Sequence, residues 1–172
     1  MDHLKKINDE VYYTNSPLTL IGQKDVNFLK QKAIENNRKR VRICAHNDIN
    51  DTLHEMIIAL ADDIYVVPHK HLNKTESFHL IEGHLLIFIF NNEGDISHLI
   101  KMGAPESGDT FYARISADFY HTVIPLSRVA IFHETTHGPF NPAKTVNAPW
   151  APNGNNPHEC IQFIEKLKNM RP

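Results

Sequence analysis

Two histidines and a glutamate at short spacing, His69, His71 and Glu76, are the residues of this sequence whose types could do chemistry together. Side chains two apart on a β-strand point to the same face, roughly 6.6 Å apart, so the two histidines can converge on one ion. Glu76 would face away on an unbroken strand, but the turn-forming pair at 73–74 reverses the chain. Gly83 then supplies a tight bend before the next apolar segment. This hairpin predicts three metal ligands.

A fourth ligand must come from elsewhere, and His121, at the start of a later apolar segment, is the best candidate. Three neutral imidazoles and one carboxylate suit a first-row divalent ion, and an octahedral ion would keep two positions open for water or substrate. The predicted cofactor is one divalent transition metal, with zinc, iron, manganese and nickel left open. His79 faces away from Glu76 by strand parity, so it is predicted to lie outside this set of four ligands, which we call the cage. The competing interpretations are a solvated hairpin for the first three ligands and an ordinary strand histidine for His121.

A second set of residues is predicted to line a pocket beside the metal. A small barrel filled with apolar side chains carries its polar residues at the open end, which makes Arg42, His54 and Tyr65 candidate substrate-binding groups. Packing or solvent exposure remains the alternative for each. His133 shares strand parity with Val129 and Ile131, so it could line the cavity or simply end its strand.

The segments that must position these residues are short and rich in β-branched and aromatic side chains. Turn-forming residues separate them. Nine such segments follow one another without intervening helices, at 41–46, 53–60, 64–71, 76–83, 84–90, 96–102, 111–116, 120–126 and 129–136. This pattern predicts an all-β sandwich or barrel.

Helical spacing is found near the two ends of the chain. Apolar residues at helical spacing follow Asp25, which can cap a helix, and Asn156 with Pro157 has the pattern of a second helix start. We expect a single domain in three parts: an N-terminal extension with a helix over 1–40, a barrel over 41–136, and a strap rich in Pro and Asn with a short helix over 137–172. The strap, which contains Trp150, could cover the barrel mouth or clasp another subunit.

Composition narrows the class of protein. The chain has 172 residues, and its 18 Lys and Arg against 20 Asp and Glu give a formal charge of -2 from intermixed signs. This balance predicts no nucleic-acid partner. The N-terminus lacks a signal-length apolar core and no apolar run could span a bilayer, so we expect a soluble, cytoplasmic protein without a membrane partner. The two cysteines give no reason to expect a disulfide in such a chain.

The ligand pattern resembles a known family. The run His-x-His-(x)4-Glu-(x)6-Gly from His69 to Gly83 resembles the first cupin motif, and "SADFYH" resembles the second motif, which ends in its metal-binding histidine, here His121. In that second motif Ser116 stands where proline is usual, and Asp118 where glycine is usual. The resemblance implies an all-β cupin double-stranded β-helix, a jelly-roll barrel, with an N-terminal helix and a short C-terminal helix.

The resemblance extends to the WbuC family of cupin-fold metalloproteins. The strings "RICAHNDINDTLHEMIIAL", "YVVPHKHLNKTESFHLIEG", "HTVIPL" and "GPFNPAKTVNAPWAP" carry it, over roughly residues 10 to 153. Members are commonly found with genes for O-antigen or other surface-polysaccharide synthesis. The resemblance therefore implies a metal, a small-molecule ligand or substrate and, as in other cupins, a homodimer. It supplies no substrate.

Three functions follow as hypotheses. The first is a metal-dependent enzyme, an isomerase, hydrolase or oxygenase, that acts on a small carbohydrate or sugar nucleotide. The second is a non-catalytic cupin that senses or carries a small ligand and uses its metal structurally. The third is a metal-free sugar-nucleotide isomerase or epimerase, which would use histidine and tyrosine as acid and base. Four intact ligand positions argue against the third.

Overall fold

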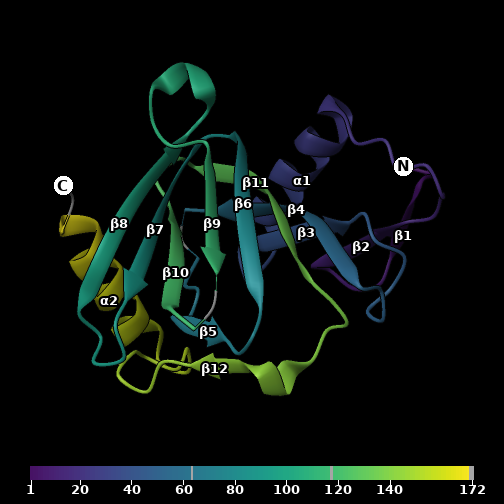
Figure 1. Cartoon of the computed structure of the whole chain (residues 1–172). Coiled ribbons are helices and arrows are strands. Elements are labelled where there is room, and N and C mark those ends of the chain that lie inside the picture. The colour runs from purple at the N-terminus through teal and green to yellow at the C-terminus, as the bar shows by residue number, and fades with distance from the viewer. Residues whose placement is uncertain (63, 117, 171–172) are drawn as a thin grey trace.

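The chain folds into two β-sheets that pack face to face, with one helix outside each (Figure 1). The computed structural model describes residues 1–62, 64–116 and 118–170. Within them, the first sheet has the spatial order β1 (Leu4–Lys6), β2 (Val11–Thr14), β3 (Arg40–Cys44), β4 (Leu53–Ala61), β11 (Val129–His137), β6 (Thr75–Glu82) and β9 (Tyr112–Ser116). The second has the order β12 (Thr145–Asn147), β5 (His69–His71), β10 (Tyr120–Pro125), β7 (His84–Phe90) and β8 (Ile96–Gly103).

The eight strands from β4 to β11 form a jelly roll. They supply the orders β4-β11-β6-β9 in one sheet and β5-β10-β7-β8 in the other, and each neighbouring pair is antiparallel. The chain thus crosses repeatedly between sheets, which is the winding of a double-sheet jelly roll. The predicted jelly-roll barrel is confirmed, and each of the nine predicted segments corresponds to one strand from β3 to β11. The short strands β1, β2 and β12 were not predicted.

The part of the first sheet formed by β3, β4 and β11 is covered on both faces. The inner face of the sheet contributes residues such as Leu80 and Phe132 to the barrel core, which also contains Leu85 and Ile87 of the second sheet. Its outer face packs under helix α1 (Gln23–Glu35), where Leu29 is fully buried. Alternate residues of a strand such as β11 therefore enter two different cores, and apolar alternation cannot distinguish inside from outside.

The two helices begin close to the predicted positions. Helix α1 starts two residues before Asp25, whose carboxylate accepts a hydrogen bond from the Gly22 amide (2.9 Å), so Asp25 stabilises the helix from its third position rather than as the cap. Helix α2 (Pro157–Asn169) has Asn156 as its cap and Pro157 at its first position, as predicted. Short 3-10 helices lie at Pro105–Ser107 and Pro142–Lys144. No described helix is long and apolar enough to cross a membrane.

The strap returns along the second sheet. Trp150 packs against Phe90 and Tyr120. Helix α2 lies along the same sheet (Figure 1), and Trp150 and α2 together cover its outer face. The indole N–H of Trp150 donates to the carbonyl of Asn92 (3.1 Å). Trp150 is therefore an anchor for its own chain, and the part of the strap near the barrel mouth is the earlier segment around Phe140, which lines the cavity described below.

Candidate metal centre

Local backbone geometry brings the hairpin residues to one end of the barrel. Asn73 turns the chain between β5 and β6 in a left-handed conformation (φ 56°), so Glu76 returns on β6. His121 of β10 lies directly opposite His69 in the strand register. Asp118, at the position where the cupin motif usually has glycine, also adopts a left-handed conformation (φ 50°), which aspartate tolerates better than most residues. The sequence departure therefore leaves the local turn intact.

Gly83 bends the chain after β6, as predicted. It has a φ of 86°, and a Cβ at this position would lie 2.7 Å from the carbonyl oxygen of Val129. Both the conformation and the close approach of the backbone require glycine.

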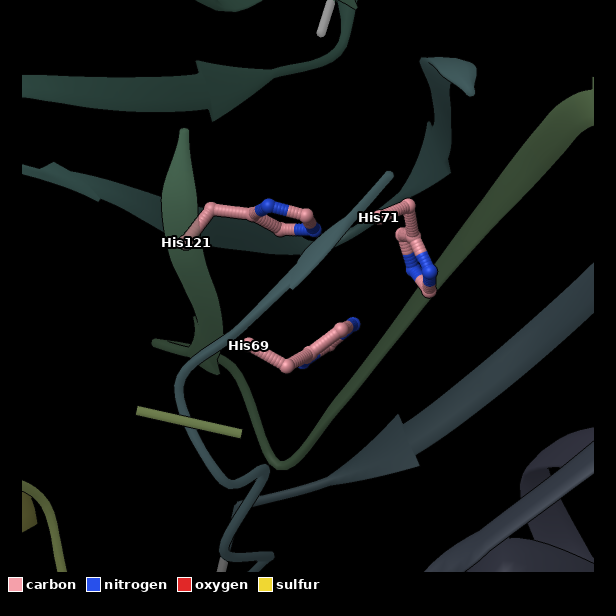
Figure 2. Close-up of side chains that lie close together, drawn as sticks. All are labelled: His69, His71 and His121. Carbon is pink, nitrogen blue, oxygen red and sulfur yellow. The ribbon is translucent and has the colours of Figure 1, made fainter. Parts of the chain in front are cut away.

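Three imidazoles and one carboxylate converge at this end of the barrel. One nitrogen from each of His69, His71 and His121 lies within 4.8 Å of the others (Figure 2). The Glu76 carboxylate lies between two of these rings, with Oε1 3.0 Å from Nε2 of His71 and Oε2 3.2 Å from Nε2 of His121. The structure thus brings the four predicted ligands together, and their donor types suit a first-row divalent ion.

The second nitrogen of each ring has its own partner. Nδ1 of His69 lies 2.8 Å from the carbonyl of Val67, and Nδ1 of His121 lies 3.1 Å from the carbonyl of Phe119. Nδ1 of His71 lies 3.0 Å from Oγ1 of Thr145 on β12. A carbonyl can only accept, so at His69 and His121 the proton belongs on Nδ1 and the Nε2 lone pair is left for a metal.

The electrostatics of the cage favour a cation inside it. Burial lowers the pKa of His69 to about 4, which keeps this ring neutral. Burial alone would raise the pKa of Glu76, but hydrogen bonds and charge from His121 and His71 outweigh that effect and lower the pKa. A charged carboxylate therefore faces the Nε2 lone pair of His121 at 3.2 Å. Such an arrangement of electron pairs is stable when a proton or a metal ion lies between them.

A cavity of about 440 Å³ adjoins the cage. All four predicted ligands line it, and most of its wall is apolar, with residues such as Phe78 and Phe132 from the barrel core. Of the three predicted substrate-binding residues, Arg42 and His54 line it. Tyr65 is not among its lining residues: its hydroxyl donates to the carbonyl of Pro152 (2.6 Å) and its ring packs against Phe163. The structure therefore places Tyr65 with the strap and α2.

His54 contributes to the cavity wall as half of a stacked pair. Its ring lies parallel to that of His46, with 4.0 Å between centroids and an interplanar angle of 7°. Nδ1 of His46 lies 3.0 Å from the Glu55 carbonyl, whereas Nε2 of His54 is buried and has no hydrogen-bond partner in the described structure. Burial lowers the pKa of both rings. The pair is thus neutral and packed.

Sequence reasoning missed Glu134, a carboxyl that lines the cavity. On β11 it follows the inward-facing Ala130 and Phe132 at the same parity, and it pairs across the sheet with Met56 and Phe78. Burial and the charge of Glu76 raise its pKa.

His133, the neighbour that the sequence offered as a possible cavity residue, instead lies on the other face of β11. Its Nε2 lies 3.7 Å from Oε1 of Glu55, outside the cavity lining. The parity of Glu134 with Phe132 becomes informative only once the structure shows that Phe132 faces inward.

Comparisons with known proteins give a family model and a set of solved structures. The model of a domain of unknown function, DUF6016, matches residues 21–102. No curated protein matches. Among solved structures, protein SO0799 from Shewanella oneidensis is 11% identical, with a TM-score of 0.49 over 60% of this chain and 66% of that one.

Two further structures are similar at the same level. The cupin domain of Schizosaccharomyces pombe Cnp3 is 8% identical, with a TM-score of 0.45 over 59% of this chain and 66% of that one. An oxalate oxidase is 18% identical, with a TM-score of 0.46 over 70% of this chain and 58% of its own. The chain spans between 21% and 66% of the length of the first five structures it matches. At these identities the activity has to be argued from the residues of this chain.

Proposed function

We propose that the protein binds one divalent transition metal through His69, His71, Glu76 and His121 and acts on a small carbohydrate or sugar-nucleotide intermediate of surface-polysaccharide synthesis. The observation that carries the metal is the contact between Glu76 and the Nε2 atoms of two histidines at 3.0 and 3.2 Å. For His121 the Nδ1 contact with a carbonyl assigns the ring proton to Nδ1, so a cation is needed between Nε2 and the carboxylate.

The alternative cation is a second proton on the ring, and the surroundings disfavour it. His69 and His71 lie close to His121, with ring centroids 4.7 and 5.9 Å away. Each additional imidazolium in this buried cluster would repel the others, and burial, followed by the charge of His121, already lowers the pKa of His69. One divalent ion satisfies all three lone pairs and the carboxylate at once.

The cavity supports a small molecule as the partner of this metal. A concave, mostly apolar space with a few convergent polar groups is typical of a ligand site. When bound, the metal would supply Lewis acidity, which polarises a carbonyl or hydroxyl oxygen or activates a water molecule. Arg42 and Glu134 present a cation and a carboxyl to the same space. The carbohydrate class is inferred from the resemblance to the WbuC family.

The test is turnover with and without metal. Protein purified without chelator should hold about one equivalent of a divalent transition metal by elemental analysis. It should convert at least one of a panel of sugar nucleotides and lose that activity on chelation. His121→Ala is expected to behave like the chelated protein, whereas His79→Ala, which changes an exposed histidine of the same strand as Glu76, should behave like the wild type.

The outcomes separate the remaining hypotheses. Activity that survives chelation, with only a loss of thermal stability, would assign the metal a structural role. Absence of metal from carefully prepared protein, together with turnover, would revive the metal-free isomerase or epimerase. Stoichiometric metal without turnover of any sugar nucleotide would leave a binding or sensing protein.

A further inference from the structure

The cavity extends beyond the barrel onto a shelf of the first sheet. Beyond β4 that sheet continues with three further strands, β3, β2 and β1, and Tyr13 of β2 and Arg42 and Cys44 of β3 line the cavity there. The register explains this placement. Arg42 pairs with Ile58, which packs on the barrel core, so the arginine lies on the same sheet face as the barrel interior.

The three arginines near this shelf differ in their partners. Arg38 and Arg40 share one carboxylate, that of Glu10, at 3.2 and 2.7 Å. Arg42 lines the cavity two residues further on and, across residues 1–62, 64–116 and 118–170, has no carboxylate at ion-pair distance. Lys74 also lines the cavity and likewise has no carboxylate at ion-pair distance among the described residues. Their charges reach the cavity interior, because both oppose the rise in the pKa of Glu134.

Glu134 supplies a different polar group deeper in the cavity. Its strand neighbours across the sheet, Met56 and Phe78, are apolar, and the described residues offer its carboxyl no hydrogen bond or ion pair. Glu134 is half-buried, so water reaches its carboxyl in the free protein, and a ligand that displaces this water has to supply hydrogen bonds in its place. Hydroxyl groups of a ligand can do so in either protonation state, because a carboxyl group accepts hydrogen bonds when charged and can also donate when neutral.

We propose that the cavity takes a hydroxylated small molecule that carries one anionic group, phosphate or carboxylate, with the anionic group on Arg42 at the shelf and hydroxyl groups on Glu134 inside. This inference rests on the proposed function and specifies the chemistry of its substrate. The guanidinium can bind either anion through two parallel hydrogen bonds, and Lys74 adds positive potential to the same cavity. A neutral sugar would leave Arg42 without a counter-charge, and a bare anion would leave Glu134 without a partner.

The experiment measures binding to the metal-loaded full chain by isothermal titration calorimetry. The probes are glucose 1-phosphate, glucuronate, glucose and inorganic phosphate. At least one of the two anionic sugars should bind at least about 10-fold more tightly than glucose. The reason is that a hydrogen bond to a charged group contributes more free energy than one between neutral groups. The same sugar should bind more tightly than inorganic phosphate. Which anionic sugar is preferred distinguishes phosphate from carboxylate.

Variants assign the two ends of the ligand. Arg42→Gln should abolish the preference for the anionic sugar over glucose. Arg114→Gln, the same change on an exposed position of β9 away from the cavity lining, should preserve it. Glu134→Leu should weaken the sugars about 10-fold and leave inorganic phosphate unchanged, and Glu134→Gln, which can still form hydrogen bonds, should recover part of the loss.

The metal content of every sample separates this inference from the proposed function. Wild-type protein without metal contradicts the proposed function. With metal present, equal affinity for glucose and both anionic sugars, binding of none of the probes, or an Arg42→Gln variant indistinguishable from wild type would overturn the inference alone. Inorganic phosphate that binds as tightly as the anionic sugars, with no effect of Glu134→Leu, would also overturn it.

Discussion

Two histidine clusters line the same cavity and are built in opposite ways. In the cage, the rings of His69, His71 and His121 meet at 51° to 78°, and one nitrogen from each ring points to a shared space (Figure 2). In the pair, the rings of His46 and His54 are parallel within 7° and touch by their faces. Lone pairs lie in the plane of an imidazole ring, so tilted rings can share an ion and stacked rings cannot.

The second difference is the carboxylate. Glu76 lies at hydrogen-bond distance from two cage nitrogens, whereas the buried Nε2 of His54 has no partner at all in the described residues. Histidine content alone is therefore a poor guide to a metal site. What defines the cage is ring orientation, a carboxylate among the nitrogens, and a hydrogen-bond partner on the far side of each ring.

The largest expected effect comes from removing a cage ligand. His71→Ala or Glu76→Ala should lower metal affinity by about 100-fold or more, since loss of a partner behind a ligand already costs about 10- to 100-fold. His46→Ala and His54→Ala should keep one equivalent of metal. The metal content that remains after competition with a chelator measures the effect of the cage variants and of the two control variants. A His54→Ala protein that loses its metal while remaining folded would show that the two clusters act as one site.

The cage could be predicted from sequence because its information is local. The spacing from His69 to Gly83 and the turn at Asn73 lie within one hairpin, and the fourth ligand follows from the resemblance of the segment ending in His121 to the second cupin motif. The wall of the cavity is not local. Glu134 and His133 are adjacent on a strand buried on both faces, so apolar alternation shows two faces but not which one faces inward.

The fold, like the site, could be predicted where the sequence signal is local. Nine apolar segments between turn formers define nine strands, from β3 to β11. Strands β1 and β2 were missed because they are short and partly exposed, with sequences LKK and VYYT. They extend the sheet that carries Arg42 and so decide the shape of the cavity. The structure places Tyr65 away from the cavity because its partners, Phe163 and Pro152, are about 90 residues further along the chain, and nothing in its own segment, 64–71, indicates them.

A second prediction concerns pH and the metal-free protein. His69 has a pKa of about 4 when folded, against 6.5 for the free side chain. Above pH 6.5 the His69 side chain is neutral in both the folded and the unfolded chain. As pH falls from 6.5 to 4, the unfolded chain gains a proton that the folded chain excludes, so the free energy of unfolding should fall by about 3 kcal/mol from this group.

Urea unfolding of chelated protein at several pH values measures this slope. His69→Gln should flatten it more than His54→Asn, because the lowering of the pKa is large at His69. Equal slopes for the two variants would contradict the difference between the clusters.

The smallest expected effect concerns the hydrogen bond between Nδ1 of His71 and Thr145, on the side of the ring that faces away from the cage. Thr145 holds Nδ1 of His71 from β12, a strand that belongs to the strap rather than to the barrel. Thr145→Val keeps the shape of the side chain and removes the hydrogen bond, and it should weaken metal binding about 10-fold. Thr135→Val, which removes a hydroxyl 3.4 Å from the ring of His133 outside the cage, is the matched control and should bind metal as the wild type does. Metal titration against a fluorescent chelator distinguishes the two. A tenfold loss confined to Thr145→Val would make the strap part of the metal centre, since a residue of the strap would then orient one of the metal ligands.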